Sequence, residues 1–346
     1  MLPLVTPLHP LTDQALARLP KAELHVHLEG SMPPETLLEL GVRHGVDDVP
    51  RTLDDVRRLF EFRDFAHFIE VYLIIVKVLQ EGADFAALAY GKGAELARHN
   101  VRYAEIFFTS PLHTDRGIPA SEIFGGLEEG RQRARAEFGV EMVFMADIPG
   151  ERGIAGAEQT LQELLDNRPP GFVALGLGGP EIGTPRPQFA PFFEAAIAEG
   201  YHSIPHAGET TGPRTVWDAL EYLHAERIGH GTSLLEDPAL VEYLVREQVP
   251  VDVSVTSNLC TKAAPSLAAH PLPRMAEAGV NVTVNSDDPP MFNTDISAEY
   301  RIARDLLGTE KLLRAARAGF ENSLLPEDRK AVYLKEFDAV LGEQLT

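Results

Sequence analysis

Eight short runs rich in β-branched and apolar residues recur along this chain, and helix-like segments separate most of them. The runs cover residues 22–27, 101–108, 140–148, 171–177, 201–206, 226–230, 249–255 and 280–286. Strands that alternate with helices form parallel βαβ units, and eight such units in one chain favour a (β/α)8 TIM barrel. The length of 346 residues suits such a barrel, so we expect a single domain over residues 1–346.

The gap between the first and second runs is far longer than the others, and we expect extra helices there, from about residue 33 to 100. Within it, the apolar stretch at 71–79 is too short to span a bilayer and contains Lys77, so it predicts a buried helix. An open doubly wound sheet is the alternative fold. We disfavour it because no glycine-rich phosphate loop follows the first run.

The charge balance limits the possible partners. The chain carries 31 Lys and Arg against 52 Asp and Glu, a net charge of −21. That field repels phosphate backbones and anionic lipid, so we expect neither nucleic acid nor a membrane as a partner. The N-terminus shows no signal-peptide pattern. Cys260 is the one cysteine; it excludes an intramolecular disulfide, favours a cytoplasmic setting, and is expected to be a packed small residue.

Imidazoles and carboxylates fall at the C-terminal ends of four of these runs, where the active sites of (β/α)8 barrels lie. They are His25, His27, His206, Glu209, His230, Asp287 and Asp288. His25 and His27 are two residues apart, so on a strand they share one face while the apolar residues between and beside them take the other. The two imidazoles are therefore expected to point into the barrel mouth.

Three imidazoles and one carboxylate are ligands that suit Zn²⁺. The sequence predicts one zinc ion per chain, held by His25, His27, His206 and Asp287. A hydrogen-bonded core histidine is the better interpretation for any one of these alone, but not for the whole set. The other histidines are left outside the site: His44, His99 and His224 are expected to face solvent from helices, and His113 and His270 to lie in loops.

Four motifs resemble those of the adenosine deaminase family, within the amidohydrolase superfamily. They are "ELHVHLEGS", "HAGE", "RIGHG" and "NSDDP", in the order and spacing of that family, and the resemblance extends from about Lys21 to Tyr300. It implies a zinc (β/α)8 barrel that hydrolyses the exocyclic amine of a 6-aminopurine. Beyond the motifs, the stretches that begin at Arg301 and Asn322 are expected to form terminal helices on the barrel.

The resemblance also implies the catalytic roles. Glu209 is expected to be the general acid that protonates purine N1, which requires a protonated carboxyl at that step. His230 is expected to orient the attacking water and stabilise developing charge. Asp287 is expected to bind the metal and also to accept the proton of the water. Zinc lowers the pKa of that water to roughly 7.

Substrate contacts follow from the resemblance in the same way. Asp288 matches the residue that hydrogen-bonds purine N7, although an Asx-turn before Pro289 is an alternative. Gly179 matches the glycine whose N–H meets purine N3, although a plain turn fits equally, and Glu29 matches the ribose-binding position. Glu181 also matches a family position, with its role left open. An apolar lid is expected from Phe65, Phe68 and Ile69, for which plain core packing is the alternative.

The resemblance narrows the possible substrates to small molecules that contain a 6-aminopurine. Members of this family act on adenosine, on free adenine, or on larger nucleosides such as 6-aminodeoxyfutalosine. The chain lacks the Asp-Ser-Ser-Glu pattern of adenine-specific members, and Gly176, Gly178 and Gly179 reduce side-chain bulk near the mouth. We therefore expect a nucleoside, with adenosine as the default and a 5′-extended adenine nucleoside as a second possibility. An adenine deaminase is the alternative.

Features of the sequence disfavour or exclude three other classes of protein. A two-metal amidohydrolase usually needs a lysine at the end of strand four, and the run at 171–177 offers none. The cysteine-liganded zinc deaminases are excluded by the single cysteine. A catalytically silent barrel used for binding is a remote alternative, disfavoured by the complete set of ligands and acids. The sequence predicts no oligomeric state.

Overall fold

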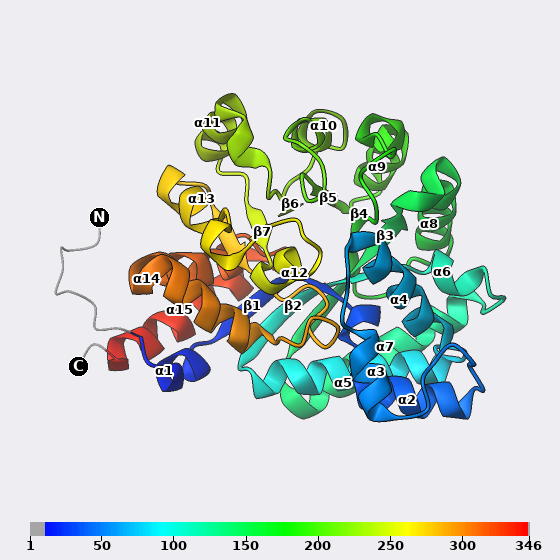
Figure 1. Ribbon diagram of the computed structural model, residues 1–346. Helices are drawn as coiled ribbons and strands as arrows, with labels where there is room; N and C mark the ends of the chain where they lie inside the picture. The colour runs from blue at the N-terminus through cyan, green and yellow to red at the C-terminus, as the bar shows by residue number, and fades with distance from the viewer. Residues whose placement is uncertain (1–10, 345–346) are drawn as a thin grey trace.

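Eight parallel strands form a barrel in the computed structural model, which describes residues 11–344 (Figure 1). The strands are β1 (Lys21–His27), β2 (Val101–Phe108), β3 (Glu141–Pro149), β4 (Phe172–Gly178), β5 (His202–Ala207), β6 (Ile228–His230), β7 (Val251–Val253) and β8 (Val282–Val284). They pair in chain order, and each overlaps one of the eight runs in the sequence. The predicted (β/α)8 barrel is confirmed.

The chain segment after β8 returns to β1 and brings the two edges of the sheet together. Val26 and Asp287 form an isolated parallel bridge. The N–H of His27 donates to the carbonyl of Asp287 at 2.9 Å, and the N–H of Asp287 donates to the carbonyl of His25 at 3.1 Å. The backbone of the barrel itself therefore fixes three predicted metal ligands, which are His25, His27 and Asp287.

Helices surround the strands. They are α1 (Asp13–Arg18), α2 (Pro34–Arg43), α3 (Leu53–Leu59), α4 (Phe65–Lys77), α5 (Gly82–Arg98), α6 (Pro111–Thr114), α7 (Ala120–Phe138), α8 (Gly153–Asn167), α9 (Ala190–Ala198), α10 (Arg214–Tyr222), α11 (Pro238–Glu247), α12 (Val255–Cys260), α13 (Leu272–Ala278), α14 (Ile296–Glu321) and α15 (Glu327–Gln344). The long gap after β1 holds α2 to α5, as expected.

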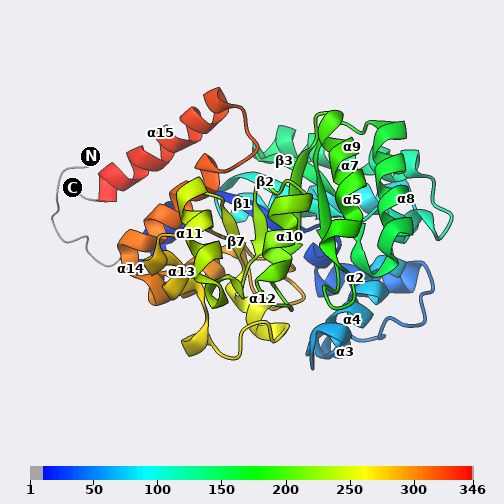
Figure 2. The same ribbon diagram turned by 90° about the horizontal axis from the view of Figure 1, so that it is seen from above.

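Helix α4 illustrates how the inserted segment folds. The Asp64 carboxylate caps its start by accepting from the N–H of His67 at 2.9 Å. Its apolar residues Val71 and Ile75 are buried, whereas Lys77 pairs with the exposed Asp48. The predicted buried helix is confirmed. Figure 2 shows α3, α4 and α12 at one end of the molecule and α15 at the opposite end.

The terminal helices cover the far end of the barrel. Tyr333 and Phe337 of α15 pack against Phe320 of α14, with ring centroids 5.5 and 6.5 Å apart. Arg102, near the start of β2, pairs with Glu336 at 2.7 Å. The end that carries α4 and α12 is therefore left for the site. Whether all of residues 1–346 form one domain stays a prediction, since 1–10 and 345–346 lie outside the described range.

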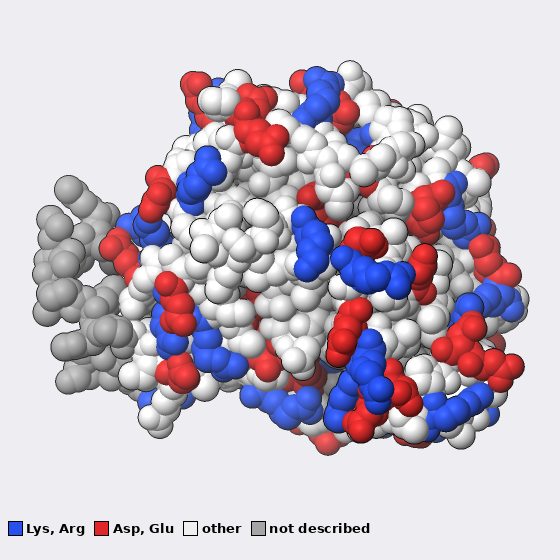
Figure 3. All heavy atoms as spheres, in the orientation of Figure 1, with Lys and Arg blue, Asp and Glu red and all other residues white. Residues whose placement is uncertain are grey.

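The surface agrees with the charge argument. On the face shown in Figure 3, basic and acidic side chains are interspersed and no broad basic field is present. Among residues 11–344, no helix combines the length and the apolar character that crossing a bilayer requires. The cytoplasmic setting and the absence of nucleic-acid and membrane partners stay predictions.

Candidate active site

The four predicted metal ligands come together at the mouth of the barrel. Nε2 of His27 lies 3.2 Å from Nε2 of His206 and 3.4 Å from Oδ1 of Asp287. Nε2 of His25 lies 3.5 Å from the same oxygen. Ligands about 2.0–2.1 Å from a tetrahedral zinc ion are roughly 3.3–3.4 Å from one another, so these spacings fit one ion at the centre of the cluster.

The hydrogen bonding of these imidazoles fits a metal as well. Both ring nitrogens of His25 and Nδ1 of His206 are buried and have no hydrogen-bond partner among the residues that the structure describes. Burial lowers the pKa of His27 to about 4 and that of His206 well below its ordinary value, so both are neutral and able to coordinate. Burial opposes protonation of His25 too, but Asp252 and Asp287 outweigh it and raise its pKa to about 9. A cation in the cluster would supply the positive charge that these carboxylates favour.

Two residues of the site have unusual backbone conformations. His230 has a φ of 65° and Asp287 a φ of 67°, in the left-handed region that non-glycine residues avoid. Both lie where a strand gives way to a loop. Left-handed residues cost of order 1–3 kcal/mol and persist where the surrounding structure determines them. Here they turn both side chains into the cavity.

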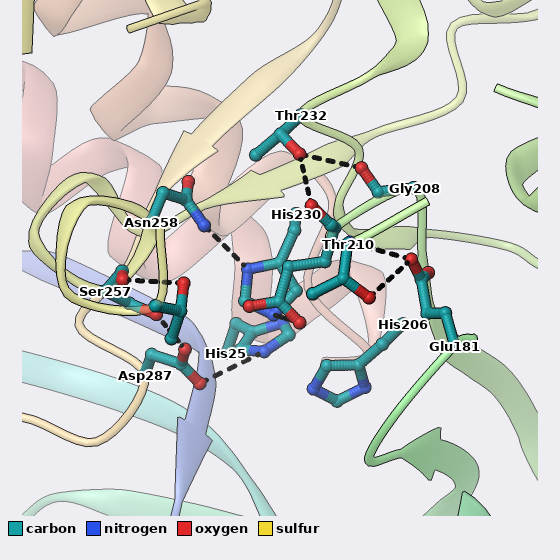
Figure 4. A network of polar contacts seen from close by, with 12 residues as sticks. His25, Glu181, His206, Gly208, Thr210, His230, Thr232, Ser257, Asn258 and Asp287 are labelled. Atoms are coloured by element: carbon teal, nitrogen blue, oxygen red, sulfur yellow. Dashed lines mark hydrogen bonds and ion pairs between the residues drawn. The ribbon is translucent and has the colours of Figure 1, made fainter. Parts of the chain in front are cut away.

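The adjacent aspartates Asp287 and Asp288 differ in protonation. Oδ2 of Asp287 accepts a hydrogen bond from the hydroxyl of Ser257 at 2.6 Å, as Figure 4 shows. Burial would raise the pKa of Asp287, but the surrounding imidazoles hold it well below its ordinary value. Burial raises the pKa of Asp288 well above its ordinary value, and the charge of Asp287 raises it further. A Cβ on Gly30 would lie 1.6 Å from Oδ1 of Asp288, so only glycine leaves room for this carboxyl.

Glu209 follows β5 and lies in the cavity wall, 7% exposed. Burial raises its pKa well above the ordinary value, and the nearby Asp287 and Glu181 raise it further. The carboxylate of Glu181 holds the loop behind it, because Oε2 accepts from the N–H groups of Thr210 and Thr211, both at 2.8 Å. Figure 4 shows this contact beside His230. The loop thus presents a buried carboxyl in the form that donates a proton.

A chain of hydrogen bonds sets the orientation of His230. The N–H of Leu272 lies 3.2 Å from Nδ1 of His270, Nε2 of His270 lies 3.3 Å from Oδ1 of Asn258, and Nδ2 of Asn258 lies 3.2 Å from Nδ1 of His230. A backbone N–H only donates, and burial lowers the pKa of His230 and of His270 to about 4. Together these facts fix the donor and the acceptor of each hydrogen bond. His230 therefore carries its proton on Nε2, which lies 3.8 Å from Oε2 of Glu209.

These groups line a cavity. Its polar floor consists of His27, His206, Glu209, His230, Asp287 and Asp288. One wall is formed by α4, through Phe65, Phe68, Ile69, Tyr72 and Leu73. The remaining wall residues are Thr109, Leu112, Asp147, Pro149, Glu151, Gly179 and Thr261. Mostly apolar walls above a few convergent polar groups suit a small organic ligand.

Comparison with known proteins identifies the family. The model of the family described as adenosine deaminase matches residues 20–340. The chain belongs to the adenosine deaminase family. It is 48% identical to the aminodeoxyfutalosine deaminase of Streptomyces coelicolor, over 93% of this chain and 84% of that protein. It is 35% identical to the adenine deaminase of Trichlorobacter lovleyi, over 96% and 95% of the two chains. The crystal structure of an adenine deaminase from Arthrobacter aurescens covers 94% of this chain with a TM-score of 0.90 at 32% identity, and 99% of that structure is matched.

Most of the residues that the adenosine deaminase resemblance named lie around this cavity. The exceptions are Glu29, Glu181 and His25, which are buried and do not line it. Oε1 of Glu29 accepts from the N–H of Thr109 at 3.0 Å and lies 3.2 Å from Nε2 of His113. Glu29 lies behind the wall residue Thr109 in this conformation, and its ribose contact stays a prediction. The functional role of every site residue stays a prediction.

The prediction about the minor histidines was partly wrong. His113 was expected in a loop but lies in α6, fully buried against Glu29, and His270 is buried against Asn258. Only His224 is fully exposed among the three expected to face solvent, since His44 pairs with Asp84 at 2.9 Å and His99 lies near Ser297 at 2.9 Å. Cys260 packs against the core in α12, as expected.

The sequence also gave no role to Asp147, Asn258 and Ser257, which the structure places in or directly behind the site. Asp147 is a single carboxylate near the end of β3, the same signal that found Asp287. Ser257 and Asn258 follow β7 in the run "VTSN", where three polar residues follow Val255. Each is a single polar residue outside a recognisable motif, and only the packing shows which group it contacts.

Proposed function

We propose that this protein uses one zinc ion to deaminate a 6-aminopurine nucleoside hydrolytically, replacing the 6-amino group by oxygen and releasing ammonia. The observation that carries the proposal is the arrangement at the barrel mouth. Three imidazoles and a carboxylate lie at metal-ligand spacing, and a buried carboxyl that follows β5 and an oriented imidazole at the end of β6 line the cavity beside them. The match to the adenosine deaminase family supports the reaction class.

In this proposal His25, His27, His206 and Asp287 hold the metal. When bound, zinc lowers the pKa of a water from 15.7 to about 7 and so supplies a nucleophile at neutral pH. Glu209 stands in the cavity with the raised pKa that a proton donor needs. It gives its proton to ring nitrogen N1, which makes C6 electrophilic. The walls of α4 exclude bulk water and keep the interactions of Glu209 strong.

The remaining polar groups orient the reactants. His230 points its Nε2–H into the cavity, where it positions the attacking water and stabilises charge on oxygen. Asp288 is buried with Oδ1 unpartnered among the described residues. A protonated carboxyl there donates to an acceptor such as purine N7. Gly179, with φ at 76°, brings its backbone to the cavity wall where a flat ring passes.

The favoured substrate is an adenine nucleoside extended at its 5′ end. The relatives named aminodeoxyfutalosine deaminase are 48% identical to this chain, whereas those named adenine deaminase are 34–38% identical. Leu73, Leu112 and Pro149 contribute apolar side chains to the cavity wall, and such side chains suit the apolar part of a group beyond the sugar. Adenosine and adenine are the competing substrates.

A direct comparison of substrates tests the proposal. Zinc-loaded protein is assayed for kcat/KM with aminodeoxyfutalosine, adenosine and adenine by the change in ultraviolet absorbance. We expect aminodeoxyfutalosine to give the highest value and adenine the lowest. An adenine value well above both nucleosides would overturn the substrate assignment, and no turnover of any of the three would overturn the proposed reaction.

A further inference from the structure

Asp147 is a buried carboxyl in the cavity wall that the proposed chemistry does not use. It lies near the C-terminal end of β3 and is 4% exposed. Its Oδ1 has no hydrogen-bond partner among the residues that the structure describes. An unpartnered buried polar atom is costly to keep. Such an atom beside a ligand cavity therefore points to a partner that arrives with the ligand.

Strand β4 is shaped to make room for this carboxyl. Asp147 pairs with Gly176 across β3 and β4. A Cβ on Gly176 would lie 2.7 Å from the ring of Phe107 and 2.8 Å from Oδ1 of Asp147, and a Cβ on Gly178 would lie 2.6 Å from Oδ2 of Asp147. The two glycines that we expected to widen the mouth for the ligand thus leave room for Asp147, and Gly176 leaves room for Phe107 as well. Any side chain larger than glycine at either position would collide with this carboxyl.

The order of the strands shows which part of the substrate Asp147 faces. The metal ligands, Glu209 and His230 come from the ends of β1, β5, β6 and β8. The arc formed by β2, β3 and β4 carries none of them and contributes Thr109, Asp147 and Gly179 to the wall. In a purine, C6 belongs to the six-membered ring and N9 to the opposite edge of the five-membered ring. With C6 at the metal cluster, N9 and the sugar attached to it face the arc that holds Asp147.

The protonation of Asp147 suits a sugar. Burial raises its pKa well above the ordinary value, and the carboxylates of Glu29 and Glu151 raise it further. A neutral carboxyl both donates and accepts hydrogen bonds, as a sugar hydroxyl does. Glu29, the residue that the family resemblance assigns to ribose, has Oε1 occupied by Thr109 and His113 and is not among the residues that line the cavity, although its Oε2 also has no hydrogen-bond partner among the described residues.

We propose that Asp147 hydrogen-bonds a hydroxyl of the substrate sugar and so selects nucleosides over the free base. This specificity contact rests on the proposed deaminase function and adds to it a residue on the arc opposite the metal cluster. Glu29 supports the wall from behind, through Thr109.

The test is a set of double-mutant cycles between the protein and the sugar. Zinc-loaded wild type, Asp147→Ala and Asp147→Asn are compared on adenosine and on its 2′-, 3′- and 5′-deoxy analogues. Each compound is scored by kcat/KM, or by its inhibition constant against the best substrate if it is not turned over. Removing the contacted hydroxyl should cost the wild type about 10-fold, the usual worth of one such hydrogen bond. In Asp147→Ala the same removal should cost less than about 2-fold.

The melting temperature distinguishes a sugar contact by Asp147 from a structural role of this residue. Since Oδ1 of Asp147 has no protein partner, Asp147→Asn should keep or raise the melting temperature while it weakens nucleoside recognition. Asp166→Asn, the same change at an exposed position on α8, is the matched control and should alter neither measurement.

Two results would overturn the assignment. One is that, for every deoxy analogue, the fold-loss in kcat/KM from the Asp147→Ala variant and the fold-loss from the missing hydroxyl multiply, which would mean that the two groups do not interact. The other is that Glu29→Gln, and not Asp147→Ala, abolishes the effect of removing a hydroxyl. Failure of the wild type to act on any purine nucleoside would instead refute the proposed function.

Discussion

Two groups of buried polar side chains differ in their hydrogen bonding. One group lies at the cavity, and the other lies just below it, toward the N-terminal ends of the strands. Below the site, Arg227 donates to Asp252 at 2.6 Å and also to Glu105, and Thr283 donates to the other oxygen of Asp252 at 2.6 Å. We call these four residues the arginine network. At the cavity, atoms of His25, His206, Asp147 and Asp288 have no hydrogen-bond partner among the described residues.

The difference separates groups that hold the fold from groups held ready for ligands. A buried charge that is fully paired costs little further free energy, whereas an unpartnered polar atom destabilises the fold unless something binds it. His25 lies at the border, with Nδ1 3.9 Å from Asp252 of the arginine network and Nε2 3.5 Å from Asp287. Changes in the two groups should therefore affect different properties.

Removal of the metal should give the largest effect on the cavity group. His27→Ala deletes one ligand of a four-ligand set, so we expect loss of zinc and of all measurable turnover. Metal analysis and an activity assay check this, with chelation of the wild type as a parallel test. His224→Ala, at an exposed position, should bind zinc and react normally. Full activity in metal-free protein would show that the cavity histidines serve another purpose.

Glu209→Gln should abolish proton donation without disturbing the fold. The amide keeps the shape of the side chain but cannot give up a proton in the same way, so we expect kcat to fall about 10²–10⁴-fold. Zinc content and melting temperature should stay at wild-type values, because Glu209 lines the cavity, is not a predicted metal ligand, and is replaced by a side chain of the same size. Near-normal kcat would remove Glu209 from the mechanism.

Arg227→Met should have the opposite profile. It leaves Glu105 and Asp252 buried without their cation, and breaking a buried pair in this way costs about 3–5 kcal/mol. Urea denaturation at neutral pH measures the loss. Arg133→Met removes an exposed arginine near Glu129 at 3.6 Å and should cost less than about 1 kcal/mol. Similar losses in the two variants would erase the contrast between the arginine network and the surface.

Asn258→Asp tests the hydrogen bonds that orient the predicted catalytic side chain of His230. A carboxylate accepts where the amide donated, so it favours a proton on Nδ1 of His230 and removes it from Nε2. We expect kcat/KM to fall about 10²-fold or more, since a wrong tautomer disables an oriented imidazole. Nitrogen NMR of labelled histidine reports the tautomer directly. A retained Nε2–H together with the same kinetic loss would show that Asn258 acts by another route.

The sequence revealed those parts of the molecule that depend on local patterns. The alternation of strands and helices predicted the barrel because each strand buries a recognisable run of apolar residues. The pair His25 and His27 was found because a spacing of two places both on one face of β1. Asp147 and His270 were missed because their significance lies in what surrounds them: two glycines across the sheet for one, and an amide from another loop for the other. The burial of Glu29 behind Thr109 could not be predicted from the sequence for the same reason, since it depends on α6 and β2.

The smallest predicted effect concerns Glu299 of α14, a carboxylate that is both buried and well paired. Its Oε2 accepts from the N–H groups of Val255 and Thr256 at 2.9 and 3.2 Å, and its Oε1 from the hydroxyl of Thr294 at 2.8 Å. Burial nevertheless raises its pKa from 4.5 to about 6, against the effect of these hydrogen bonds. The folded state therefore holds the proton more tightly than the unfolded state, and stability should fall as pH rises from about 4.5 to 6.

The size of this decline follows from the shift of the pKa. A rise of roughly 1.5 pKa units corresponds to about 2 kcal/mol of unfolding free energy. Glu299→Gln keeps an acceptor for the two N–H groups but does not titrate, so the decline between pH 4.5 and 6.5 should be smaller than in the wild type by about this amount. Glu310→Gln, at an exposed position on the same helix, should retain the wild-type slope. Identical slopes in all three proteins would mean that the hydrogen bonds to Glu299 fully offset its burial, and that a well-paired carboxylate in this barrel carries no net cost.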